Sequence, residues 1–216
     1  MANDISAGLS SFWAAIAFQG ALIPLALVLA WAFGLTPWAD LHAAGRDIGL
    51  AVALTVPMVA LGVVLLQLPY DWVRDLEARV REVFVPLFHR VGLPGIIMVS
   101  ILAGVGEELL FRGVVQEALM AWGADVPGFL LASVIFGLCH FITPAYFWLA
   151  TGMGLYLGGL YVWTGNLLVP IIVHGLYDFV ILSYYWFRYR PDPSPSANEP
   201  PRQAPDEVDM PSSSGQ

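Results

Sequence analysis

Hydrophobic residues dominate this chain in long runs that short polar segments separate. About 20 apolar residues are enough for a helix to cross a bilayer. Runs of this kind predict six membrane-spanning helices, the fourth of them short, at 10–35, 48–68, 95–122, 127–141, 144–163 and 167–187. The pattern therefore predicts an all-α fold, a polytopic transmembrane helix bundle.

The segment between the second and third runs has a different pattern. In residues 71–90 the apolar side chains recur at helical spacing, and the opposite face carries arginines and carboxylates. This arrangement predicts an amphipathic helix that lies on the membrane surface. Two roles remain open for it, a linker between spans and an element that gates access of a substrate. The apolar positions are Trp72, Val73, Leu76, Val80, Val83 and Phe84.

Composition supports a membrane protein. The chain is 58% hydrophobic and 12% charged with a mean hydropathy of +0.70, whereas soluble domains carry about 25% charged residues. The net charge of −8 gives no reason to expect a nucleic-acid partner. A single cysteine, Cys139, excludes an intrachain disulfide and a multi-cysteine zinc site. The N-terminus lacks a basic segment and a cleavage site, so the first span is expected to stay in the membrane.

Arginine placement predicts the topology, because cytoplasmic loops collect basic residues. The most basic loop holds Arg74, Arg79, Arg81 and Arg90. If this loop is cytoplasmic, six spans place both termini in the cytoplasm, and the protein lies in the cytoplasmic membrane. The Pro/Ser-rich acidic segment 191–216 is predicted to be a disordered tail. The membrane domain is therefore expected to cover residues 1–190.

Ionisable residues occur inside the third run. A carboxylate at bilayer depth costs about 2.5 kcal/mol or more, so such residues usually serve a function. Glu107 and Glu108 are adjacent, and Arg112 follows Glu108 by four residues. On a helix Glu108 and Arg112 can form an ion pair, although that pair considered alone has an equally good structural interpretation. Glu107 is rotated by about 100° from Glu108 and is free for another role.

Two further runs carry polar residues. His140 stands in the fourth, and His174 and Asp178 stand four residues apart in the last. Each has a structural interpretation alone, but together with a glutamate they supply the groups of a water-activating centre. Glu107, His140 and His174 are candidate ligands for Zn²⁺. A metal-free centre, with glutamate as base and histidine as oxyanion stabiliser, is the alternative.

The order of these motifs resembles the CPBP family, the CAAX protease and bacteriocin-processing group that is also called ABI. The resemblance covers about residues 103–180, roughly a third of the chain. Each motif is short, and the order, spacing and membrane setting make the combination specific. The motifs are Glu107-Glu108-Leu-Leu-Phe-Arg112, Phe136-Gly-Leu-Cys-His140 and His174-Gly-Leu-Tyr-Asp178.

The resemblance implies an intramembrane endopeptidase related to the type II CAAX prenyl endopeptidases. It assigns the activation of water to Glu107 and the holding of that water or a metal to His140. His174 and Asp178, an asparagine in many members, would bind the water or stabilise the oxyanion. Glu108 and Arg112 would support the site. Well-studied members have about eight membrane helices, whereas six are predicted here.

The expected substrate is a membrane-associated protein or a leader peptide, and the lipid bilayer is the other partner. Two rival functions use the same polar cluster. In a non-catalytic membrane scaffold or bacteriocin-immunity protein the cluster is structural. In a small proton-coupled transporter the carboxylates and imidazoles relay protons, but the inverted repeats expected of a transporter are not seen in the sequence. Nothing in the sequence indicates an oligomeric state.

Overall fold

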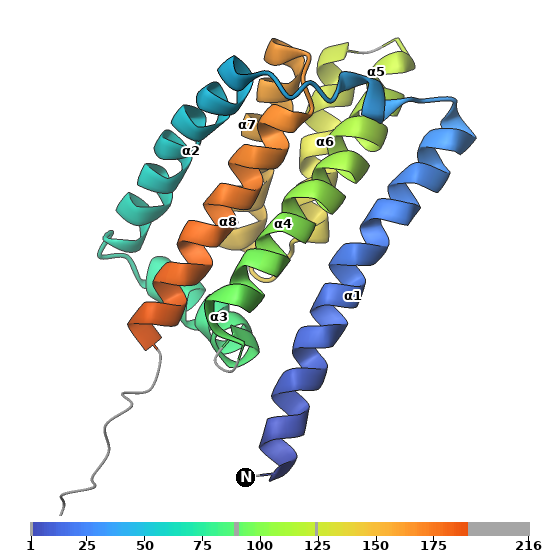
Figure 1. Ribbon diagram of the computed structural model, residues 1–216. Coiled ribbons are helices and arrows are strands. Elements are labelled where there is room, and N and C mark those ends of the chain that lie inside the picture. The colour runs from blue at the N-terminus through green and yellow to red at the C-terminus, as the bar shows by residue number, and fades with distance from the viewer. Residues whose placement is uncertain (1, 89–90, 124, 190–216) are drawn as a thin grey trace, which may run out of the picture.

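The computed structural model describes residues 2–88, 91–123 and 125–189, and within these ranges the chain forms a helical bundle (Figure 1). This confirms the all-α prediction. The segment predicted to be a disordered tail lies outside the described residues. The elements are α1 (Ala2–Phe33), the 3₁₀ helix η1 (Pro37–Asp40), α2 (Gly45–Leu66), α3 (Asp71–Phe88), α4 (Gly92–Leu110), the π-helical segment η2 (Phe111–Gln116), α5 (Glu117–Ala121), α6 (Asp125–Cys139), α7 (Pro144–Thr164) and α8 (Leu168–Tyr189).

The six predicted spans all appear as helices, but fewer qualify as membrane spans. By length and composition, four helices of the described part are apolar enough to cross a membrane: α1, α2, α8 and the continuous helix from α4 to α5. With 15 residues, α6 is shorter than a full span. The 21 residues of α7 include glycines, tyrosines and tryptophans that lower its hydropathy. All six predicted spans are therefore helices in the structure, and four of them meet the length and hydropathy of a membrane span.

α4 and α8 form the centre of the bundle (Figure 1). α8 packs between α2 and α4, while α1 packs against α4 and lies at the edge of the bundle. α6 and α7 pack tightly against each other behind them. The beginning of α1, the helix α3 and the end of α8 all lie at one end of the bundle, so α1 and α8 run in opposite directions.

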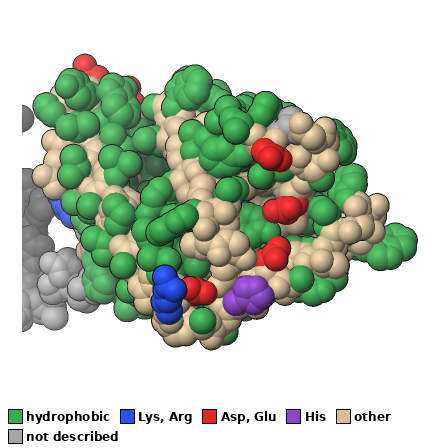
Figure 2. Space-filling model, turned by 90° about the horizontal axis from the view of Figure 1, so that it is seen from above, with side chains coloured by type: hydrophobic (Ala, Val, Ile, Leu, Met, Phe, Trp, Pro, Cys, Tyr) green, Lys and Arg blue, Asp and Glu red, His purple; other side chains and the backbone are tan. Residues whose placement is uncertain are grey.

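The α3 helix confirms the predicted amphipathic helix. Its apolar side chains Val73, Leu76 and Phe88 are buried against the bundle. On its polar face Arg79 pairs with Glu82. Its position on the membrane surface remains a prediction. The end of the bundle opposite α3 carries carboxylates among hydrophobic side chains and little positive charge (Figure 2), as expected for an outside face.

Local sequence signals fix the boundaries of α7. Thr143 precedes the helix, and its Oγ1 accepts a hydrogen bond from the backbone N–H of Tyr146 at 3.1 Å. Pro144 occupies the first helical position, where no N–H is needed. At the other end Gly165 adopts φ 59°, a left-handed conformation that favours glycine. These signals turn the chain sharply into α8, which carries two of the predicted site residues.

Candidate active site

Close packing of α4 against α8 places the predicted site residues of these helices opposite one another. The contact point is Gly104, where a Cβ atom would lie 2.8 Å from the backbone carbonyl oxygen of Ile171. Only a residue without a side chain allows this approach of the two backbones. Glu107 and Glu108 follow within one turn of Gly104, so they face His174 on α8 directly.

Glu108 is the centre of a fully buried network. Its Oε1 accepts hydrogen bonds from Nη1 of Arg112 at 2.6 Å and from the ring of His174, whose Nδ1 lies 2.7 Å away. Nη2 of Arg112 also donates to the carbonyl oxygen of Gly154 on α7 at 3.2 Å. The guanidinium lies over the ring of Phe136, 4.4 Å from its centroid. The predicted Glu108–Arg112 pair is therefore confirmed, and it links α4 to α7 and α8.

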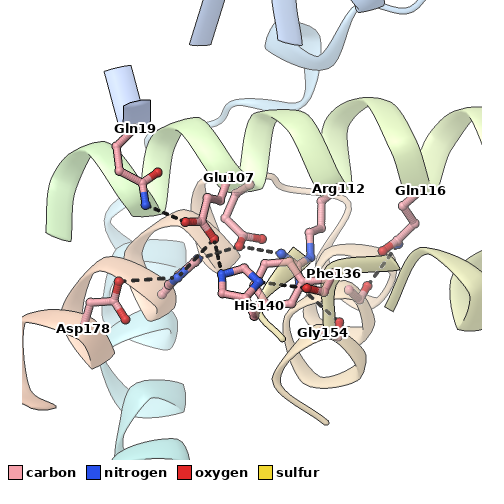
Figure 3. A network of polar contacts seen from close by, with 11 residues as sticks. Gln19, Glu107, Arg112, Gln116, Phe136, His140, Gly154 and Asp178 are labelled. Carbon is pink, nitrogen blue, oxygen red and sulfur yellow. Dashed lines mark hydrogen bonds and ion pairs between the residues drawn. The ribbon is translucent and has the colours of Figure 1, made fainter. Parts of the chain in front are cut away.

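Glu107 has a separate set of partners (Figure 3). Its Oε1 accepts a hydrogen bond from Nε2 of Gln19 on α1 at 2.8 Å. Its Oε2 lies 3.3 Å from Nε2 of His140 and 4.0 Å from Nε2 of His174. Because the two glutamates are rotated relative to each other, one side chain faces a buried arginine and the other faces two imidazoles.

Gln19 is a site residue that the sequence motifs did not identify. It belongs to none of the three motifs and lies far from them along the chain. A signal was nevertheless present, because Gln19 is the one amide side chain in the predicted first span 10–35. A polar side chain in such a run needs a partner at membrane depth, and in this fold the partner is Glu107.

The hydrogen bonds of the His140 and His174 rings indicate which ring nitrogen carries the hydrogen and which one faces Glu107 as an acceptor. Nδ1 of His140 lies 2.8 Å from the carbonyl oxygen of Phe136, and a carbonyl oxygen only accepts. Nδ1 of His174 faces the carboxylate of Glu108. These contacts assign the ring hydrogens to Nδ1, so a neutral ring presents a lone pair at Nε2. Oε2 of Glu107 is buried and lacks a hydrogen-bond donor among the described residues. With neutral rings, it therefore faces two other acceptor atoms, Nε2 of His140 and Nε2 of His174.

Three acceptor atoms gathered in this way are stabilised by a proton donor or a cation placed between them. A water molecule can donate to two of the three atoms and leave its oxygen free to react. Such an arrangement can hold a water molecule next to a carboxylate base.

One side of the site is open. The side chains of His140 and Asp178 are 26% and 25% exposed, whereas that of Glu108 is fully buried. Oδ2 of Asp178 lies 3.6 Å from Nε2 of His174, too far for a direct hydrogen bond. The structure thus brings together all six predicted site residues, with a dry side at Glu108 and an accessible side at His140 and Asp178.

The donor types predicted for Zn²⁺ are present in the site. Among the described residues, no group of three or more His, Cys, Asp and Glu side chains is placed so that it could hold a metal ion. Zn²⁺ remains a prediction that metal analysis can test.

The third predicted span differs from a regular helix at Arg112. Residues Phe111–Gln116 form a π-helical segment, a feature that is frequent at functional sites. Both Arg112 and Gln116 reach α7, where Nε2 of Gln116 donates to the carbonyl oxygen of Gly158 at 3.3 Å. The sequence predicted one uninterrupted helix, because a π-helical turn has no distinct hydrophobic period.

The fourth predicted span also needs a correction. It was expected to include His140 and end at Phe141, but α6 ends at Cys139. His140 therefore lies just beyond the helix, in the connection to α7. This position explains why its ring is partly exposed although it contacts the buried Glu107.

Two other side chains that can take part in acid–base or redox chemistry, those of His42 and Cys139, are not among the six site residues. The backbone of His42, not its ring, forms hydrogen bonds with Asn166. Cys139 is exposed and unpaired. His89 lies outside the described residues.

An apolar cavity of about 370 Å³ lies between α4 and α8. It contains none of the six site residues, and its lining includes one polar side chain, Ser100, among isoleucines, Val105, Leu176 and Phe179. The polar centre described above is therefore separate from this cavity.

The protein is thus a bundle of apolar helices that surrounds a buried cluster of carboxylates and imidazoles. Residues 89–180 match the family model described as "Type II CAAX prenyl endopeptidase Rce1-like". This segment, which is similar to that family, holds all six predicted site residues. The predicted relationship to the CPBP group is thereby confirmed.

Two curated relatives support this assignment. The chain is 34% identical over 106 residues to "Uncharacterized protein YpbD" of Bacillus subtilis (strain 168), a match that covers 48% of this chain and 52% of the relative. It is 40% identical over 98 residues to "Membrane-embedded CAAX protease MroQ" of Staphylococcus aureus (strain USA300), covering 40% of this chain and 38% of the relative. The chain thus spans about half or less of the length of these relatives. No solved structure gives a significant match.

Proposed function

We propose that the protein is an intramembrane endopeptidase that hydrolyses a peptide bond of a membrane-associated protein or leader peptide. One observation carries the proposal: Oε2 of Glu107 faces Nε2 of both His140 and His174, while the two Nδ1 atoms are held by other groups. A base beside two oriented imidazoles is an arrangement that suits water attack on a carbonyl carbon.

In the proposed mechanism Glu107 is the general base. A water held between its Oε2 and the Nε2 atom of His140 loses a proton to Glu107 as its oxygen attacks the carbonyl carbon. His174, with Asp178 beside it, helps to position this water. When the C–N bond breaks, the proton passes from Glu107 to the leaving nitrogen. No covalent enzyme intermediate is required.

Glu108 and Arg112 have a supporting role in this proposal. Neither side chain is exposed to a substrate, because the Glu108 side chain is fully buried and that of Arg112 is 2% exposed. Their ion pair compensates the cost of burying either charge. By accepting the Nδ1 hydrogen of His174, Glu108 also fixes the orientation of that ring.

The proposed location is the cytoplasmic membrane, with the lipid bilayer and a membrane-embedded or membrane-associated substrate as partners. Arg74, Arg79 and Arg81 lie on α3, at the end of the bundle where α1 begins and α8 ends (Figure 1). By the positive-inside rule this end faces the cytoplasm, so both termini are proposed to be cytoplasmic. The relative from Staphylococcus aureus, whose name describes a membrane-embedded protease, supports this setting.

Proteomics of membranes can test the function and identify a substrate. Membranes that contain the wild-type chain, Glu107→Ala or His174→Ala are compared by mass spectrometry of newly formed peptide termini. A candidate is then incubated with purified protein in liposomes. We expect cleavage by the wild type and a loss of about 10²-fold or more in both variants.

Glu82→Ala is a suitable control, because Glu82 forms an exposed ion pair on α3. It should cleave at the wild-type rate. Cleavage that persists in Glu107→Ala would contradict the mechanism and favour the rival in which the polar cluster is structural.

A further inference from the structure

The first helix contributes to the site although it lies outside the segment 89–180 that matches the family. α1 packs along α4, and the close contact falls at Gly106, directly before Glu107. A Cβ atom at Gly106 would lie 2.9 Å from the backbone carbonyl oxygen of Gln19 and 3.2 Å from Cβ of Leu22. The absence of a side chain at Gly106 therefore allows Gln19 to approach Glu107.

The amide of Gln19 has a defined orientation. Nε2 donates to Oε1 of Glu107 at 2.8 Å, and a carboxylate oxygen cannot donate in return, so the opposite orientation would place two acceptors together. The amide oxygen, Oε1 of Gln19, is buried without a hydrogen-bond partner among the described residues. A buried amide oxygen without a partner is unfavourable. Stability alone therefore does not explain a glutamine at this position.

We propose that Gln19 is a positioning residue for Glu107, an inference that rests on the proposed endopeptidase function. A carboxylate can rotate about its last bond and exchange its two oxygens. The hydrogen bond from Gln19 holds Oε1 on the α1 side, so Oε2 stays directed toward His140 and His174. The base is thus oriented by a helix outside the three sequence motifs.

The consequence for catalysis follows from geometry. Without Gln19 the carboxylate samples rotations in which neither oxygen faces the imidazoles, so fewer encounters are productive. Gln19 donates to Glu107, whereas the exposed side of the site is formed by His140 and Asp178, so binding of the substrate should change little. Loss of Gln19 should lower kcat and leave KM nearly unchanged.

The test compares Gln19→Leu, Gln19→His and the control Gln67→Leu as full-length chains in liposomes with a substrate that the wild type cleaves. Leucine matches glutamine in size but cannot donate, whereas Nε2–H of histidine reaches about as far as the glutamine amide. We expect Gln19→Leu to lower kcat by about 10- to 100-fold, the usual effect of losing a group that orients a functional side chain. KM should stay within about threefold. Gln19→His should recover part of the rate, and Gln67→Leu at the end of α2 should match the wild type.

A second variant tests whether the position of α1 and the Gln19 side chain act on Glu107 through the same interaction. Gly106→Ala displaces α1 from α4 by the contacts given above, so it should lower kcat as well. Adding Gln19→Leu to Gly106→Ala should then cause little further loss, because both changes remove the same interaction.

The outcomes are distinguishable. If the wild type cleaves, Glu107→Ala does not and Gln19→Leu retains its kcat, the role of Gln19 is wrong while the function stands. A rate in Gln19→His no higher than in Gln19→Leu, or fully additive losses in the double variant, would also overturn it. If Glu107→Ala cleaves like the wild type, the proposed function itself fails.

Discussion

Glu108 and His174 are joined by a hydrogen bond of 2.7 Å, although 66 residues separate them in the sequence. The bond connects α4 to α8 in the middle of the bundle. The same carboxylate oxygen binds Arg112 at 2.6 Å. A single buried oxygen therefore holds both the charge of the arginine and the orientation of an imidazole.

This double role predicts that Glu108 matters more for stability than Glu107. Glu108→Gln leaves Arg112 buried without a counter-charge, and breaking a buried pair costs about 3–5 kcal/mol. Glu107→Gln removes the base but keeps a polar side chain of the same size, so its main effect should be on cleavage. Unfolding midpoints in detergent, measured for both variants, check this difference. Equal stability of the two variants would contradict the assignment of roles.

Glycines on α7 allow a matched test of helix packing. A Cβ atom at Gly154 would lie 3.0 Å from the backbone carbonyl oxygen of Ser133 on α6, whereas at Gly152 it would meet nothing within 4 Å. Gly154→Ala should destabilise the protein by about 1–3 kcal/mol through overpacking. It should also disturb Arg112, which donates to the Gly154 carbonyl.

Gly152→Ala is the control for that substitution, with the same chemical change on the same helix. Thermal unfolding in detergent should show a clear loss for Gly154→Ala and almost none for Gly152→Ala. A comparable loss at both positions would mean that the packing of α6 on α7 is not the cause.

Asp178 should tolerate a neutral replacement. Its Oδ2 lies 3.6 Å from Nε2 of His174, so no short charged hydrogen bond is lost in Asp178→Asn. We expect this variant to keep its cleavage rate within about tenfold, while His174→Ala loses about 10²-fold or more. Rates measured side by side in liposomes decide the point. An Asp178→Asn variant as inactive as His174→Ala would show that the charge itself is needed.

Chelation should separate the two chemistries that the sequence left open. Among the described residues, no group of three or more His, Cys, Asp and Glu side chains is placed so that it could hold a metal ion. We therefore expect cleavage to survive dialysis against a zinc chelator, with no stoichiometric zinc in the purified protein by elemental analysis. Loss of activity on chelation and its return with Zn²⁺ would instead support the predicted zinc site.

Much of the fold could be predicted from the sequence, because its signals are local. Apolar runs located every long helix, and helical spacing identified the amphipathic helix α3 between them. Helical geometry also predicted that Glu108 and Arg112 pair and that Glu107 points elsewhere. Two features could not be predicted in this way. α6 has the composition of a membrane span but too few residues, and a π-helical turn at Arg112 leaves no periodic signal in the sequence.

The sequence by itself thus determined which residues are costly to bury and which of them share a helix face. The tertiary structure alone decided which faces meet. The close contact at Gly104 joins α4 to α8, and the one at Gly106 joins α1 to α4. The first contact allows the hydrogen bond between His174 and Glu108, and the second allows the one between Gln19 and Glu107. The physical reason is that helical periodicity fixes the direction of a side chain relative to its own helix axis, whereas the partner depends on how closely two backbones can approach.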